Sequence, residues 1–278
     1  MTAVGSFLQT RAKGGEWLVR IENIDPGREV VGAGDGILAE LERLGLHWDG
    51  PVIWQHTRRE AHRAALEELR RDGFLYRCRC SRRLTGSGPY PGTCRELELP
   101  ATTPGTWRLR VPDSMLAVED LVQGPYRQQL ATACGDFVAW RADDWPAYHL
   151  AVVVDDGWQG ITEVVRGADL LDSTPRQCWL QSCLGLPQPS YAHLPLALEP
   201  TGAKLSKDVG SAPVRGTPAG TLLTEALRFL GLAAPPDLAA ASTADILAWG
   251  LAHWRLEKVP RQSRVVEPVP PGRPSRPP

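Results

Sequence analysis

The stretch that decides the fold runs from Trp17 to Gly73: WLVRIENIDPGREVVGAGDGILAELERLGLHWDGPVIWQHTRREAHRAALEELRRDG. It opens with the apolar run 17–21, which is typical of a buried strand and is ended by polar residues and a proline. The segment 37–44 has the apolar spacing of a helix, and the short run 52–54 is again strand-like.

A helix-start signal lies in the last part of this stretch. Thr57 and Glu60 have the spacing of a capping box, in which a hydroxyl and a carboxylate satisfy free N–H groups of the first turn. The helix that follows carries apolar residues on one face and ends at Gly73. The order strand, helix, strand, helix predicts an α/β fold with a parallel, Rossmann-like sheet.

The composition is that of an ordinary globular protein. Of 278 residues, 42% are apolar and 23% are charged, which allows a sizeable core and about two domains. The net charge of −1 excludes a strongly basic nucleic-acid coat protein. Residues 58–95 nevertheless hold ten arginines against four acidic residues, a local charge of +6. This basic segment fits either phosphate contacts or a solvated helix face.

The sequence contains no targeting signal that we can identify. No run of about 18 uncharged apolar residues is present, and the first residues lack a signal-peptide cleavage site. The six cysteines are clustered rather than spread as a disulfide framework. We therefore expect a cytoplasmic protein without membrane association.

The pattern changes after Gly73 and returns near residue 146. Residues 74–145 hold short strand-like pieces between loops and predict an insertion domain, and 151–156 (AVVVDD) predicts a buried parallel strand. Thr174 as cap and Pro175 in the first turn predict another helix.

The expected domains are a catalytic domain (1–73 and 146–216), the insertion (74–145), a C-terminal helical region (217–259) and a disordered Pro/Arg-rich tail (260–278). Within them we expect a first helix ended by Gly14 and Gly15, insertion strands at 74–78, 106–111 and 137–140, and helices at 219–230 and 243–254.

Three cysteines in the insertion are candidate metal ligands. Cys78, Cys80 and Cys94 lie within 17 residues and are joined by a Gly/Pro-rich loop, and Tyr90 could add a phenolate oxygen. The alternative is three reduced, half-buried thiols without a metal. The remaining cysteines, Cys134, Cys178 and Cys183, are expected to be ordinary core thiols.

A glycine-containing loop carries two lysines suited to a polyphosphate. Lys204 and Lys207 flank Ser206 in the segment 201–208, and Gly202 allows the backbone to turn closely. Taken by itself, this motif is also compatible with a solvated surface loop.

Polar residues at strand ends suggest an amino-acid pocket. Glu22 follows the first strand, Tyr148 precedes the run 151–156, and Arg166 ends another apolar run. Ligands of open α/β sheets bind beyond the carboxyl ends of strands, where an arginine can hold a carboxylate and a glutamate can hold an ammonium group. Taken alone, each of these residue types is more often part of a structural ion pair.

Taken in order, these pieces resemble the catalytic portion of class I glutamyl-tRNA synthetases, and most closely the shorter glutamyl-queuosine tRNA(Asp) synthetase family. The resemblance covers roughly residues 3–232. It is carried by WLVRIENIDPGRE (17–29), LGLHWDG (44–50), YRCRCSRR with YPGTCR (76–95), YHLAVVVDD (148–156), ITEVVRGADLLDSTPRQ (161–177), YAHLPL (191–196) and KLSK (204–207).

The resemblance implies a function. Members of the shorter family lack the anticodon-binding domain, activate glutamate with ATP as glutamyl-adenylate without tRNA, and transfer it to queuosine in the anticodon of tRNA(Asp). By this resemblance Glu22, Tyr148 and Arg166 bind glutamate. Lys207, with Lys204 nearby, contacts ATP together with Mg²⁺. The insertion holds a structural zinc ion through Cys78, Cys80, Tyr90 and Cys94, and the enzyme is a monomer.

The beginning of the sequence departs from the family pattern. The family opens with a strand and a HIGH-like loop that binds the ATP phosphates at a helix N-terminus. Residues 3–13 match only the helix that follows this loop, so the first strand and the HIGH-like loop are expected to be absent. The alternatives are a non-catalytic RNA-binding remnant and a fragment of a glutamyl-tRNA synthetase.

We therefore expect the 278-residue chain not to catalyse glutamate-dependent exchange of pyrophosphate into ATP. The reason is that the backbone groups that would hold the phosphates are missing. Exchange of labelled pyrophosphate measures this directly, and robust exchange by this chain would contradict the expectation.

Overall fold

The computed structural model describes residues 1–81, 85–86, 88–199 and 216–265. Its α-helices are α1 (Thr2–Ala12), α2 (Ala33–Arg43), α3 (Arg59–Arg71), α5 (Leu130–Ala133), α6 (Tyr148–Gln159), α7 (Thr174–Cys183), α8 (Ala219–Phe229) and α9 (Thr243–His253). Its strands are β1 (Arg20–Ile21), β2 (Ile53–Trp54), β3 (Leu75–Cys78), β4 (Thr106–Leu109), β5 (Met115–Asp120), β6 (Gly124–Gln129), β7 (Phe137–Trp140), β8 (Glu163–Gly167), β9 (Ser190–Leu194), β10 (Ala197–Leu198) and β11 (Arg264–Val265). Short 3₁₀ helices are η1 (Gln55–Arg58), η2 (Ala168–Ser173), η3 (Pro236–Ala240) and η4 (Leu256–Lys258).

The catalytic part has the predicted α/β architecture with parallel strands. β1 pairs with β2 in parallel, and β8 pairs with β9 in parallel. Helices connect the strands of each pair, as parallel strands require. In the described part of the chain the two pairs are separate sheets, and β9 also pairs in parallel with the end of β5.

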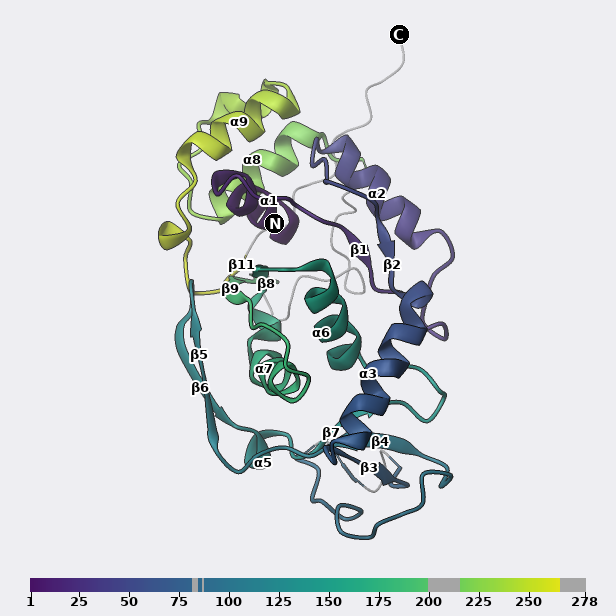
Figure 1. Ribbon diagram of the computed structural model, residues 1–278. Helices are drawn as coiled ribbons and strands as arrows, with labels where there is room; N and C mark the ends of the chain where they lie inside the picture. The colour runs from purple at the N-terminus through teal and green to yellow at the C-terminus, as the bar shows by residue number, and fades with distance from the viewer. Residues whose placement is uncertain (82–84, 87, 200–215, 266–278) are drawn as a thin grey trace.

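The chain has two main hydrophobic cores, one at each end of the molecule (Figure 1). The first lies among α1, α8 and α9 and includes the fully buried Leu8 and Leu227. The second lies among α3, α6, α7 and the insertion strands and includes Leu69 and Leu150. The predicted first helix is confirmed: α1 buries Val4 and Leu8, and the chain leaves it through Gly14, whose φ of 66° favours glycine.

The insertion contains the predicted small antiparallel strands. β3, β4 and β7 form a three-stranded antiparallel sheet. A second feature was not expected from the sequence: β5 and β6 form a long hairpin that runs along the side of the molecule, from the insertion to β9 (Figure 1). This hairpin makes the insertion continuous with the sheet of the catalytic part.

The prediction of a strand at 151–156 is wrong, because this segment lies inside α6. The apolar run is buried on several sides, since α6 contacts α3, α7 and β7. A short, continuous apolar run does not distinguish a buried strand from a buried helix, and here packing overrides the strand preference of its valines. Tyr148 is consequently the first residue of a helix rather than the residue before a strand.

Two local predictions also need correction. The capping box at Thr57 does not form, because η1 precedes α3 and the Thr57 hydroxyl donates to the carbonyl oxygen of Trp54. Ser173 rather than Thr174 is the N-cap residue of α7, with Pro175 in its first turn as predicted.

Two of the predicted C-terminal helices are confirmed, and other predicted segments lie outside the described residues. The helices expected at 219–230 and 243–254 are present as α8 and α9. β11 pairs with β10, so the ordered chain extends into the segment expected to be disordered. The rest of that tail (266–278) and the loop 200–215, with Lys204 and Lys207, lie outside the described residues.

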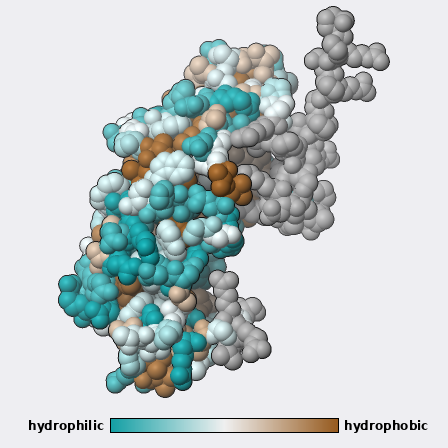
Figure 2. Space-filling model, turned by 90° about the vertical axis from the view of Figure 1, so that its right-hand side faces the viewer, coloured by the Kyte–Doolittle hydropathy of each residue, from teal (hydrophilic) through white to brown (hydrophobic). Residues whose placement is uncertain are grey.

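Much of the face formed by α2 and α3 is hydrophilic, with small, separate hydrophobic patches (Figure 2). The exposed apolar side chains next to α2 include Val31, which is 99% exposed. Within the residues that the structure describes, we find no helix long and apolar enough to cross a membrane.

The packing of α1 against α8 and α9 leads to a test of stability. Leu8 is fully buried in this core, so Leu8→Ala leaves a cavity and is expected to lower the free energy of unfolding by about 2–5 kcal/mol. Leu251→Ala is the matched control: Leu251 lies on α9 but is 37% exposed, and its loss is expected to cost about 0.5 kcal/mol or less. Urea unfolding followed by circular dichroism gives both values. Equal effects would contradict the placement of α1 in the core.

Candidate functional site

The three predicted pocket residues come from separate elements and lie in one electrostatic neighbourhood. Glu22 follows β1, Tyr148 begins α6, and Arg166 lies in β8. The charges of Glu22 and Arg166 both affect the pKa of Tyr148, which burial, the larger effect, raises. The structure therefore brings together the residues that the sequence placed in one pocket.

Glu22 shares this region with a buried ion pair that the sequence did not suggest. Arg20 donates to Asp156 over 2.8 Å and lies 3.4 Å from a carboxylate oxygen of Glu22. Burial raises the pKa of Glu22, and Arg20 opposes this rise. The side chain of Glu22 remains 40% exposed, so its carboxylate is available to a ligand.

Arg166 is buried and held on one side by hydrogen bonds. Its Nε donates to Nε2 of His193 over 3.0 Å, and its Nη2 donates to the hydroxyl of Thr174 over 2.9 Å. Nη2 also lies 3.4 Å from the carbonyl oxygen of Leu170. The orientation of the guanidinium is thus fixed before any ligand binds.

A buried amide lies beside Tyr148. Gln177 of α7 is 1% exposed, and its side chain lies near the phenol of Tyr148. Its Nε2 has no partner of good geometry within the described ranges. Buried amide hydrogens are normally satisfied, so this donor is placed to meet a ligand or a water molecule.

This arrangement suits a small zwitterion such as an amino acid. A fixed guanidinium binds a carboxylate through charge-assisted hydrogen bonds, and the carboxylate of Glu22 can accept from an ammonium group. The site contains the positive charge of Arg166 and the negative charge of Glu22. Arg20 and Asp156 add no net charge, because they pair with each other.

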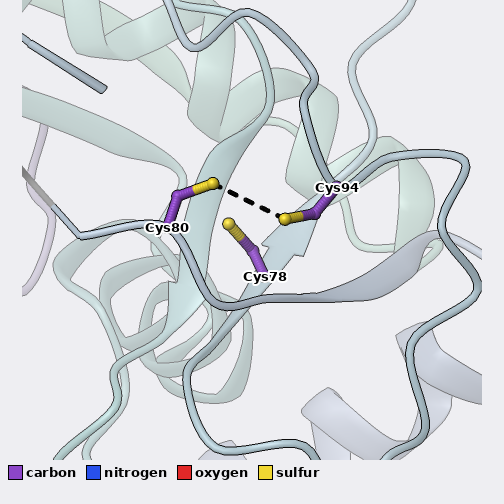
Figure 3. Close-up of side chains that lie close together, drawn as sticks. All are labelled: Cys78, Cys80 and Cys94. Carbon is purple, nitrogen blue, oxygen red and sulfur yellow. Dashed lines mark hydrogen bonds between the residues drawn. The ribbon is translucent and has the colours of Figure 1, made fainter. Parts of the chain in front are cut away.

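The three cysteines of the second predicted site, in the insertion, lie close together. The thiols of Cys78, Cys80 and Cys94 converge, and their sulfur atoms all lie within 4.8 Å of one another (Figure 3). The sulfur atoms of Cys80 and Cys94 are 3.5 Å apart. The phenol oxygen of Tyr90 lies 3.3 Å from the sulfur of Cys78 and 3.8 Å from that of Cys80.

These separations fit a tetrahedral ion. Four donors at about 2.0–2.3 Å from a zinc ion lie roughly 3.3–3.8 Å from one another. Burial opposes ionisation of Cys78, but hydrogen bonds from Tyr90, the Cys80 backbone and Arg108 lower the pKa of this thiol to about 7. Three thiols, one of which has a pKa near neutrality, form a donor set typical of zinc.

A buried carboxylate connects the cysteine cluster to the insertion sheet. Asp136 accepts from the hydroxyl of Tyr76 over 2.7 Å and from Arg95 over 2.9 Å. The backbone N–H of Val111 donates to the same carboxylate over 2.8 Å. Arg95 directly follows Cys94, so this network orients the loop that carries the third thiol.

Several arginines of the basic segment 58–95 have partners inside the protein. Arg58 pairs with the buried Asp155, whereas Arg59 and Arg63 both pair with Asp144. These three arginines are therefore not a purely solvated helix face.

The sequence did not reveal four residues that complete the pocket: Arg20, Asp156, Asp120 and His193. Arg20, Asp156 and His193 belong to stretches that carry the family resemblance, and this is the only sequence signal they give. Asp120 and His193 are 73 positions apart and meet only because β5 pairs with β9.

Comparisons with known proteins agree with this geometry. The model of the family "tRNA synthetases class I (E and Q), catalytic domain" matches residues 1–84 and 98–215. A crystal structure of the glutamate-tRNA synthetase of Elizabethkingia anophelis superposes with a TM-score of 0.77 at 25% identity. The superposition covers 96% of this chain and 64% of that chain.

Curated relatives match over nearly the whole chain. The glutamyl-Q tRNA(Asp) synthetase of Pseudomonas aeruginosa (strain LESB58) is 51% identical over 269 residues, which cover 96% of this chain and 92% of that protein. The protein of the same name from Dechloromonas aromatica (strain RCB) is 50% identical over 280 residues, with 97% and 93% coverage. The chain is therefore a ligase that belongs to the class I tRNA synthetases for glutamate and glutamine, in the family of the glutamyl-Q tRNA(Asp) synthetases.

Proposed function

We propose that the reaction of this protein is the activation of glutamate with ATP, without tRNA, and its transfer to queuosine in the anticodon of tRNA(Asp), with the activation step impaired in these 278 residues because they hold no HIGH-like loop. The observation that carries the proposal is the pocket in which Glu22 and Arg166 lie together in a chain about half identical to glutamyl-Q tRNA(Asp) synthetases. The partners are L-glutamate, ATP and queuosine-containing tRNA(Asp), and the enzyme acts as a monomer.

The pocket residues divide the recognition of glutamate between them. Arg166 binds a carboxylate of the substrate, Glu22 accepts from its ammonium group, and the Tyr148 phenol lies within reach of both charges. In the adenylate the α-carboxylate has become part of the mixed anhydride. The side-chain carboxylate is then the only one left for Arg166 to bind.

The activation step needs positioning and charge neutralisation more than proton transfer. The nucleophile is an ionised carboxylate that attacks the α-phosphate in line, and pyrophosphate leaves. Lys207, with Lys204, contacts the departing phosphates in this proposal, which follows the family resemblance because both lysines lie outside the described residues. Mg²⁺ bound with ATP would neutralise phosphate charge.

The cysteine cluster is proposed to hold a structural zinc ion through Cys78, Cys80, Cys94 and Tyr90. The converging sulfur atoms and the nearby phenol oxygen support this donor set. No open coordination position is needed, because four protein ligands close the site. The ion would hold together the loop that follows β3.

Replacement of one cysteine tests the metal site. Cys80→Ala is expected to lower the zinc content from about one ion per chain to well below that value, since only three ligands remain. Cys134→Ala is the matched control, because Cys134 lies in the same insertion but bonds to backbone carbonyls of Leu130 and Gly135. Elemental analysis after dialysis gives both contents. Unchanged zinc in the Cys80→Ala protein would contradict the assignment.

Transfer can be tested independently of activation by supplying freshly synthesised glutamyl-adenylate. We expect the chain to move labelled glutamate onto tRNA(Asp) that carries queuosine, at a rate above the spontaneous reaction. tRNA(Asp) with guanosine at the same position is the substrate control and should remain unlabelled. Arg166→Gln should slow transfer at limiting adenylate, whereas Arg28→Gln should not, since Arg28 is 83% exposed. Binding of the tRNA without any transfer would instead identify a non-catalytic RNA-binding remnant.

A further inference from the structure

We propose that His193 is a positioning residue for Arg166, holding its guanidinium in the orientation that selects a carboxylate over an amide in the amino-acid pocket. This inference rests on the proposed function, because it concerns how the same pocket distinguishes glutamate from its amide. It assigns a role to a buried histidine that does not itself touch the substrate.

The hydrogen-bond pattern fixes the tautomer of His193. Arg166 has donors and no acceptor, so Nε2 of His193 must accept from Nε of Arg166 over 3.0 Å. The ring hydrogen therefore lies on Nδ1, which faces a carboxylate oxygen of Asp120 at 2.6 Å. The hydroxyl of Thr174 lies 3.2 Å from the same Nε2, so this nitrogen contacts both Arg166 and Thr174.

Asp120 is itself fixed at the end of β5. One of its carboxylate oxygens accepts from the backbone N–H groups of Val122, Gln123 and His193, at 2.7–3.1 Å. Despite burial, which acts in the opposite direction, the hydrogen bonds from His193 and these N–H groups keep the pKa of Asp120 low. The carboxylate is therefore a firm support for the imidazole.

This support leaves one part of Arg166 for the ligand. Its Nε and Nη2 atoms bond to His193, Thr174 and Leu170, while Nη1 has no hydrogen-bond partner in the described part of the chain. The guanidinium is planar, so fixing Nε sets the direction of Nη1. Without the acceptor on His193, only the bonds of Nη2 to Thr174 and Leu170 hold the plane, and a bound carboxylate loses part of its alignment.

A purely structural role is the alternative to be separated. His193 is fully buried and stacks on Tyr191 with the rings 15° from parallel, so any replacement also changes core packing. Loss of packing would weaken every ligand alike. Loss of positioning would weaken only ligands that carry a carboxylate where Arg166 binds it.

Two replacements of similar polarity separate the two bonds of the imidazole. The amide oxygen of His193→Gln can occupy the place of Nε2 and accept from Arg166. His193→Asn is shorter, so its amide can replace Nδ1 toward Asp120 but does not reach Arg166. Both variants place an amide side chain at sequence position 193.

The measurement is binding of two stable sulfamoyl-adenosine analogues, one carrying glutamate and one carrying glutamine, by calorimetry. We expect His193→Asn to weaken binding of the glutamyl analogue roughly 10- to 100-fold and to change binding of the glutaminyl analogue little. His193→Gln should retain most of the preference for the glutamyl analogue. In an Arg166→Lys background His193→Asn should cost little more, because a residue that acts through Arg166 is not additive with it.

Three outcomes would overturn the proposal. Equal weakening of both analogues, or full additivity with Arg166→Lys, would leave His193 only a structural role. A wild-type preference retained in His193→Asn would show that Arg166 needs no such support. If the wild-type chain binds neither analogue, the proposed function fails, and the positioning role fails with it.

Discussion

The carboxylate of Asp155 is the buried charge on which the arrangement of the helices depends. It is fully buried in α6 and accepts from Arg58 over 2.6 Å, from Gln55 over 2.9 Å and from His62 over 3.0 Å. A buried carboxylate is costly unless hydrogen bonds replace its hydration, and here three donors from η1 and α3 do so. These bonds hold α3 against α6, which carries Tyr148 at one end and Asp156 near the other.

The contact between α3 and α6 sets the positions of the site residues. α6 presents Asp156 to Arg20 at the end of β1, and Glu22 lies two residues further along the same segment. On the other side, β8 and β9 bring Arg166 and His193 into register as Cα partners. Elements from both halves of the catalytic sequence thus contribute to one pocket, while the insertion between them supplies Asp120 through the β5–β6 hairpin.

Local sequence patterns were sufficient for part of this result. The α/β order of residues 17–73, the first helix and the three converging cysteines could be predicted, because spacing along the chain carries the information. The run 151–156 could not be assigned correctly, since valines that are buried on several sides look alike in a strand and a helix. The link between Asp120 and His193 depends on a pairing of distant strands, which no local period encodes.

The pairing of the arginines in α3 has a consequence for how the protein would respond to salt. Charge counted along residues 58–95 suggests a strong ionic attraction to a polyanion. However, a guanidinium already bonded to Asp155 or Asp144 displaces few counterions from a phosphate backbone, because it must first give up its own carboxylate. Any affinity of this face for a polyanion should therefore fall less steeply with rising ionic strength than its number of arginines implies.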